Sequence, residues 1–341
     1  MILLLLVLAA ASGVFAARTE PYASWIDQVF SLAGAPGPKP AIALPAGSAD
    51  YAAETLAALD MRTCFDAATS FADNSERPWL VRDTRLPPPP GAWTFPDLND
   101  YPGLVKLEQI KSSLGSSREH CGAARISDHW FMTASHCILN HQVPGARATD
   151  LILITPDTDA FSETVQTVPV DGAVCHLDFG MDQWRFSNDI ALMYVADISA
   201  LDDVAVAALE PRGLDLRRGD LSAFHIAGWG SNGDFRFLQG GEVAPERVGQ
   251  SVLVTSRING NGPDVGDSGS PLYSRIDGQP VVMGVLSNVR SQVPRELRSA
   301  AFVRVKGVRD WLDTAMALCA QNGEFVCGSA QGPRPAQTQR D

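Results

Sequence analysis

Three short segments constrain this chain more than any other feature of its sequence. Residues 133–137 read Thr-Ala-Ser-His-Cys, residues 188–192 read Asn-Asp-Ile-Ala-Leu, and residues 266–272 read Gly-Asp-Ser-Gly-Ser-Pro-Leu. They supply a histidine, an aspartate and a serine in that order. Each segment alone is weak evidence, because a Gly-Asp-Ser-Gly run can be an ordinary turn. Together they match one known chain order of a base, the group that orients it, and a nucleophile.

These residue types suit the roles that acyl transfer requires. A serine hydroxyl is a weak nucleophile and needs a base within hydrogen-bond reach. Histidine can be that base near neutral pH, and a buried carboxylate holds its ring in the correct tautomer. We therefore predict Ser268 as nucleophile, His136 as general base and then acid, and Asp189 as the orienting carboxylate. Glycine permits unusual backbone torsions, so the backbone N–H groups of Gly266 and Ser268 form the predicted oxyanion hole.

The sequence around these motifs resembles that of the trypsin-like (chymotrypsin-fold) serine peptidases. The resemblance runs from about residue 101 to residue 312 and includes Tyr-Pro-Gly-Leu-Val-Lys-Leu at 101–107 and Ala-Gly-Trp-Gly at 227–230. It implies an all-β fold, a double antiparallel β-barrel with a C-terminal helix, with the three residues in the cleft between the barrels. Two local patterns agree: Asp277-Gly278 between apolar runs predicts a hairpin, and apolar residues recur at helical spacing from Val305 to Cys319.

Composition divides the chain into four segments. The chain begins with an almost wholly apolar run, which predicts a signal peptide over residues 1–16 or, if it is not cleaved, a membrane anchor. Residues 17–92 form a Pro/Ala-rich N-terminal extension or pro-region, in which four consecutive prolines mark a rigid boundary. We expect the peptidase domain at 93–318 and a C-terminal tail at 319–341, which is polar from residue 331 onward.

The chain has six cysteines, and none forms a Cys-x-x-Cys pair. An even number of cysteines in an exported chain predicts disulfides, so we expect a secreted or periplasmic protein. The family resemblance implies a bridge that closes the histidine loop. A second bridge would close a short loop after the last helix, and the third follows by elimination. The expected pairs are Cys121–Cys137, Cys319–Cys327 and Cys64–Cys175.

Charge and ligand chemistry narrow the expected partners. The formal net charge is −12 and there is no basic run, which argues against nucleic acid. The expected partner is a polypeptide substrate, with a membrane only if the N-terminal segment stays uncleaved. A metal site of His129, His136, Cys137 and His141 is an alternative, but its spacing matches no zinc signature. We therefore expect neither a metal nor a cofactor.

The chain departs from the family pattern at the place of proteolytic activation. Where the family has Ile-Val-Gly-Gly, residues 90–93 read Pro-Gly-Ala-Trp. In the family, the amino group freed by cleavage pairs with the aspartate beside the nucleophile, here Asp267. That terminus cannot form at 90–93, so we predict that Asp267 is satisfied by backbone N–H groups, a nearby cation or an unusual terminus.

A second departure concerns the specificity pocket. The cysteines that brace it in the family are missing, and Asp264 stands where one of them would be. The resemblance places Gly262 at the pocket floor and Ser287, Val289 and Ala300 along the substrate and the pocket wall. A glycine floor offers no counter-charge to Arg or Lys, and valine narrows the entrance, which predicts a small or medium apolar side chain before the cut. The alternative is that Asp264 turns inward and supplies a counter-charge.

Three functions compete on these observations. The first is a secreted or periplasmic serine endopeptidase that acts through an acyl-enzyme on Ser268, favoured by the complete set of three residues. The second is a catalytically weak or inactive protease-fold binding protein, favoured by the missing activation terminus and the altered pocket. The third, an α/β-hydrolase esterase, requires Gly-x-Ser-x-Gly with the histidine last, which is not the order here.

Overall fold

The described part of the chain lies mostly between residues 96 and 327. The computed structural model describes residues 61–64, 96–110, 118–139, 151–157, 159–160, 162–177, 179–182, 185–216, 223–230, 237–290, 294 and 297–327. The expected signal peptide, the proline run and the segment at 90–93 lie outside these ranges. Among the described helices, none combines the length and apolar character needed to cross a membrane.

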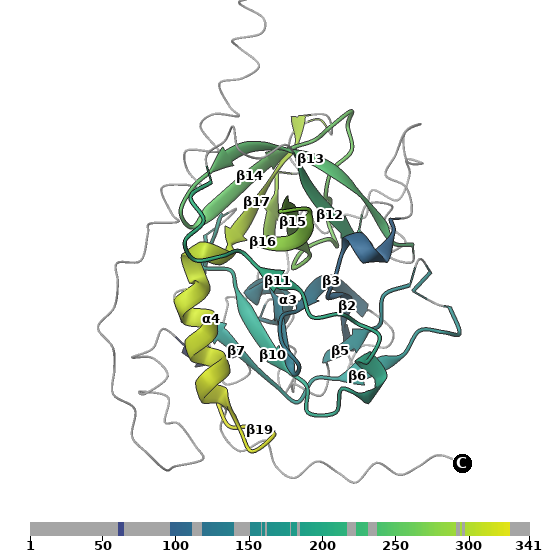
Figure 1. Ribbon diagram of the computed structural model, residues 1–341, viewed down its shortest axis with the longest axis vertical. Helices are drawn as coiled ribbons and strands as arrows, with labels where there is room; N and C mark the ends of the chain where they lie inside the picture. Colours follow the sequence, from purple (N-terminus) through teal and green to yellow (C-terminus); the bar gives the residue numbers. More distant parts are fainter. Residues whose placement is uncertain are drawn as a thin grey trace, which may run out of the picture.

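The first sheet comes mainly from the first half of the chain and has eight strands in the order β1-β7-β10-β4-β3-β2-β5-β6 (Figure 1). All its described pairings are antiparallel. The described strands curve as a half-barrel, in which β1 and β6 are the two edges. The bounds are β1 Met61–Thr63, β2 Leu104–Ile110, β3 Arg118–Arg125, β4 Trp130–Thr133, β5 Leu151–Ile154, β6 Thr167–Pro169, β7 Gly172–His176 and β10 Ala191–Tyr194.

The second sheet closes into a barrel. Its order is β11-β16-β15-β12-β13-β14-β17, and an additional β16–β17 pairing joins the ends of the six antiparallel strands. The short β11 lies outside the barrel and pairs with β16 in parallel. The bounds are β11 Ala208–Leu209, β12 Phe224–Gly228, β13 Gln239–Val248, β14 Val252–Ser256, β15 Pro271–Ile276, β16 Gln279–Val289 and β17 Ser299–Arg304. The expected all-β, double-barrel fold with a C-terminal helix is confirmed.

Shorter elements complete the description. Two hairpins lie outside the main sheets, and two 3-10 turns and two α-helices connect or cover the strands. These elements are β8 Gly180–Asp182, β9 Arg185–Ser187, β18 Ala320–Gln321, β19 Glu324–Phe325, η2 Leu98–Asp100, η4 Ser199–Leu201, α3 Ser135–Leu139 and α4 Val305–Cys319.

Both local patterns in the sequence are confirmed. Asp277 and Gly278 have φ values of 51° and 79° and connect β15 to β16, the backbone that a two-residue hairpin turn requires. The predicted helix is α4, which lies alongside β7 and β10 (Figure 1). Its Trp311 ring is 5.4 Å from the ring of His176 on β7. Trp311 thus packs against the first sheet, although the helix directly follows β17 of the second and also contacts β16 and β17.

Three disulfides join distant and near parts of the described chain. Cys64–Cys175 attaches the strand from the N-terminal extension to β7, where the two strands also pair from Met61↔His176 to Thr63↔Val174. The other two bridges span 16 and 8 residues. The three pairs are Cys64–Cys175, Cys121–Cys137 and Cys319–Cys327.

We predict that removing each bridge lowers the free energy of unfolding in the order of loop length. In the chain-entropy model the costs are about 5, about 3 and about 2.5 kcal/mol for the separations of 111, 16 and 8 residues. The measurement is urea unfolding of the three paired Cys→Ala variants. Equal losses for the longest and the shortest loop would show that the long bridge does not stabilise the protein by lowering the entropy of the unfolded chain.

Candidate active site

The nucleophile motif forms a compact turn that two glycines permit. Asp267 N–H donates to the Asp264 carbonyl at 3.1 Å, and Ser270 N–H donates to the Asp267 carbonyl at 3.0 Å. Gly266 and Gly269 have φ values of 97° and 78°, in the region that L side chains rarely adopt. Ser268 lies between them and is partly exposed. The motif therefore presents the serine on a tightly turned backbone.

This turn is held between the two sheets. On one side, Gly122 N–H of β3 donates to the Ser268 carbonyl at 2.7 Å; on the other, Gly269 N–H donates to the Leu286 carbonyl of β16 at 2.8 Å. The contact with the first sheet is very close, since a Cβ on Gly122 would lie 2.2 Å from Ser270 Oγ, and one on Gly269 would lie 2.3 Å from Thr133 Oγ1. Glycine at both positions lets the turn meet the strands beside the histidine segment.

His136 and Asp189 form a buried pair. The His136 backbone N–H donates to Asp189 Oδ1 at 2.9 Å, and His136 Nδ1 lies 2.6 Å from Asp189 Oδ2. The histidine side chain is 7% exposed and the aspartate 0%. Because a carboxylate can only accept, Nδ1 carries the proton, and Nε2 is the nitrogen that would take a proton from a nucleophile.

A third donor to the same carboxylate comes from the second barrel. Ser287 Oγ on β16 donates to Asp189 Oδ2 at 2.7 Å. The sequence suggested only a place beside the substrate for Ser287, and no local pattern links it to Asp189, which lies 98 positions away. The side chain of Ser135 also bonds this segment, donating to the Ile190 carbonyl at 2.5 Å. Both sheets therefore fix the orienting carboxylate.

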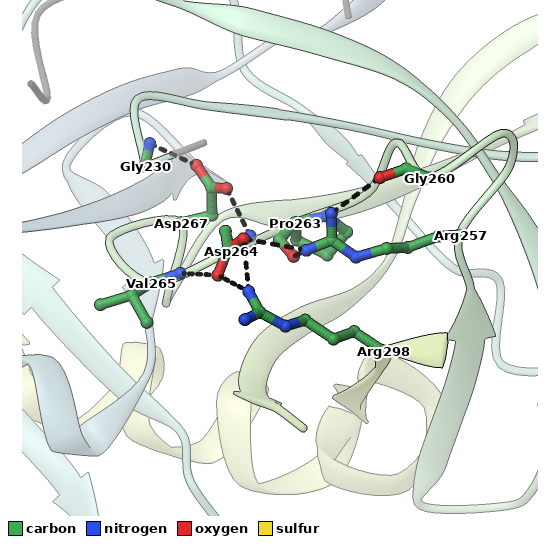
Figure 2. A network of polar contacts seen from close by, with 8 residues as sticks. All are labelled: Gly230, Arg257, Gly260, Pro263, Asp264, Val265, Asp267 and Arg298. Carbon is green, nitrogen blue, oxygen red and sulfur yellow. Dashed lines mark hydrogen bonds and ion pairs between the residues drawn. The ribbon is translucent and has the colours of Figure 1, made fainter. Parts of the chain in front are cut away.

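Asp267 is buried directly beside the nucleophile and is satisfied by backbone donors (Figure 2). Gly230 N–H donates to its Oδ1 at 2.6 Å, and Asp264 N–H donates to its Oδ2 at 2.9 Å. Burial raises the pKa of Asp267 to about 7, while these two hydrogen bonds and the charge of Arg257 lower it. Backbone N–H groups are thus one of the partners expected from the sequence. A Cβ on Gly228 would lie 2.3 Å from Asp267 Oδ1, which explains the need for glycine there.

Two of the expected pocket residues, Val289 and Ala300, lie where the end of β16 meets the start of β17. Val289 and Ala300 pair across β16 and β17, and Ala300 is buried. A Cβ on Gly262 would lie 2.5 Å from Arg257 Cγ, so the glycine leaves room for the stem of that arginine. A small hollow adjoins this region, lined by Thr255, Ser256, Arg257, Pro263, Arg298, Ser299 and Ala300.

Asp264 is engaged by two arginines (Figure 2). Arg257 Nη2 lies 3.1 Å from Asp264 Oδ2, and Arg298 Nη1 lies 3.0 Å from Oδ1 and 2.9 Å from Oδ2. A carboxylate with two cationic partners has little remaining negative charge to offer a third. This pairing weighs against Asp264 as the counter-charge for a basic substrate side chain.

Among the described residues, Cys121, His136 and Cys137 lie close enough together to suggest a metal site. Both cysteines are joined in a disulfide, and a metal requires thiolates. The residue chemistry does not fit a metal there. His141, considered as a fourth ligand, lies outside the described residues.

Comparison with known proteins points to one family. A family model described as Trypsin matches residues 105–312. Chymotrypsin-like elastase family member 1 from Bos taurus is 27% identical over 240 residues, which cover 64% of this chain and 86% of that protein. The protein of the same description from Homo sapiens is 29% identical over 239 residues, covering 64% of this chain and 89% of its own. The matched region extends from β2 into α4 and contains all three motifs.

We predict that Asp267 makes stability depend on pH. Its pKa in the folded protein is about 7, against an ordinary value of 3.8, so the folded state holds the proton more tightly. That contribution is complete below about pH 4 and is lost as the pH rises through 7. Relative to Asp267→Asn, the wild-type free energy of unfolding should fall by up to about 1.4 kcal/mol per pH unit in this window. Urea unfolding of both proteins measures it, and parallel pH profiles would contradict it.

Proposed function

This chain belongs to the trypsin family of serine peptidases, and we propose that it is an endopeptidase that cleaves peptide bonds through an acyl-enzyme on Ser268. The observation that carries the proposal is the buried pair of His136 and Asp189, with 2.6 Å between Nδ1 and Oδ2. This pair lies beside the strands on which the Ser268 turn packs. The arrangement supplies a nucleophile, a base and an orienting group, each from a different segment.

The proposed reaction proceeds in two halves. Ser268 Oγ attacks the scissile carbonyl while His136 Nε2 accepts the hydroxyl proton, and the negative oxygen forms hydrogen bonds with the N–H groups of Gly266 and Ser268. His136 then protonates the leaving amine, which departs as the acyl-enzyme forms. His136 then takes a proton from a water molecule, whose oxygen attacks the ester carbonyl, and the bond to Ser268 Oγ breaks as His136 returns the proton to that oxygen. Asp189 stabilises the imidazolium in both halves.

We predict that Ser268→Ala abolishes covalent labelling by a fluorophosphonate and lowers peptide turnover by several orders of magnitude. His136→Ala should be about as damaging, because the two side chains act as one unit. Mapping the modified peptide in the wild type identifies the nucleophile. Labelling that persists in Ser268→Ala would exclude the assignment. A correctly folded wild type that is never labelled would favour the alternative, a protease-fold protein that binds without turnover.

The proposed compartment is extracellular or periplasmic. Three disulfides in the described chain support it, since such bonds persist in oxidising environments. The apolar N-terminal run of the sequence fits an export signal.

The proposed substrate preference follows from the charges at the pocket. The stem and Nε of Arg257, a side chain that is 2% exposed, pass beside Gly262, and Asp264 is engaged by two arginines. A Lys or Arg side chain would therefore meet a cation and no available carboxylate, at a large cost in desolvation. Val289 and Ala300, which pair across β16 and β17, add apolar side chains to this region. These features support small apolar side chains before the cut, and the names of the elastase relatives agree with a non-tryptic specificity.

We predict that peptides with Ala or Val before the cut have kcat/KM values at least about tenfold above those of matched peptides with Arg or Lys. The reason is that burying an unpaired charge costs more than about 1.4 kcal/mol, the free energy that corresponds to a factor of ten. The test is a panel of fluorogenic peptides that differ only at that residue. A preference for Arg or Lys would overturn the pocket assignment and identify Asp264 as a counter-charge.

A further inference from the structure

The ion pairs around Asp264 are better shielded from water than an ordinary surface pair. The side chains of Arg257, Asp264 and Arg298 are 2%, 16% and 22% exposed. By comparison, the side chains of the pair Arg275–Asp100 are 48% and 50% exposed. Partial burial strengthens the Coulomb attraction and reduces screening by salt, whereas exposed pairs contribute little. We call Arg257, Asp264 and Arg298 the arginine clamp.

The clamp is connected to the nucleophile turn through Asp264, and Arg257 Nη2 also donates to the neighbouring Pro263 carbonyl at 2.5 Å. The backbone of Asp264 bonds Asp267 twice, since its N–H donates to the Asp267 carboxylate at 2.9 Å and its carbonyl accepts the Asp267 N–H at 3.1 Å. Its side chain also accepts from Val265 N–H at 3.0 Å. A carboxylate held by two arginines therefore fixes the residue at which the turn toward Gly266 and Ser268 begins.

The clamp also balances the charge near the turn. Asp267 is 1% exposed, and Asp264, which pairs with both arginines, is its neighbour in the network (Figure 2). Two aspartates and two arginines together carry no net charge when all are ionised. The charge of Asp264 raises the pKa of Asp267 and that of Arg257 lowers it, so the arginine offsets part of the repulsion between the two carboxylates of this turn.

We propose that the arginine clamp holds the nucleophile turn in its reactive conformation, and that Arg298 is a positioning residue for the oxyanion hole. Arg298 lies just before β17, whose Ala300 pairs with Val289. Through Asp264 it ties the strand at the pocket to the turn that carries the N–H groups of Gly266 and Ser268. The inference rests on the proposed function. It means that the positive charge supporting this turn comes from within the chain and needs no newly cleaved terminus.

The test compares Arg298→Met, which removes the charge but keeps much of the length, with Arg298→Lys and with the matched control Arg275→Met. All are made in the full uncut chain. We expect Arg298→Met to lower kcat and the rate of fluorophosphonate labelling at least about tenfold, with KM changed less than threefold. Arg298→Lys should recover part of the loss, and Arg275→Met should match the wild type.

Two further readouts separate positioning from general destabilisation. The proton resonance of His136 Nδ1–H, which reports the pair with Asp189, should stay unchanged in Arg298→Met. Amide hydrogen exchange should accelerate in residues 264–270 and not in β2 or β3.

Wild-type labelling at Ser268 together with unchanged labelling and exchange in Arg298→Met would overturn the clamp while leaving the proposed function standing. Loss of the His136 resonance in that variant would also overturn it, because the effect would then be general. An unlabelled wild type would instead refute the proposed function, on which the clamp's catalytic role depends.

Discussion

The conformation of the nucleophile turn depends on one carboxyl group that is almost inaccessible to water. Asp267 is 1% exposed, and a carboxyl group removed from water must find hydrogen-bond partners inside the protein. Two backbone N–H groups meet that need, those of Gly230 and Asp264. The second can reach the carboxylate only when the turn from residue 264 closes on itself. Since Ser268 is the next residue, satisfying Asp267 and presenting the nucleophile become a single geometric condition.

This condition can be met because glycines let neighbouring backbone segments approach the turn closely. Around the turn, Gly122 and Gly228 stand where a Cβ would collide with Ser270 Oγ at 2.2 Å and with Asp267 Oδ1 at 2.3 Å. The first contact brings β3 against the turn, and the second brings the end of β12 over the carboxylate. A larger residue at Gly122 would push the first sheet away from the turn, and one at Gly228 would push the turn away from β12 within the second barrel. The glycines of the motifs thus act through packing as much as through backbone torsion.

Sequence patterns predicted the features that depend on neighbours in the chain. The Asp277-Gly278 turn and the apolar spacing that became α4 each need only a few adjacent residues, and both were found. The partners of Asp264 depend on folding instead. Arg257 and Arg298 lie 7 and 34 positions away. Nothing in the sequence around an arginine indicates which carboxylate it will pair with in the folded protein. For the same reason, no sequence pattern indicated the bond from Ser287 to Asp189 or the edge strand β1, Met61–Thr63.

Bracing the pocket with ions rather than with a covalent bond has a physical consequence. The strength of an ion pair depends on its exposure to water, whereas a disulfide holds its distance in any solvent. Arg298 is 22% exposed and lines the hollow beside Ala300. A substrate side chain that displaced water there would lower the local dielectric and tighten the pair with Asp264. Because Asp264 also begins the nucleophile turn, the clamp we propose would be firmest when the pocket is filled, which links recognition of the substrate to the placement of the oxyanion donors.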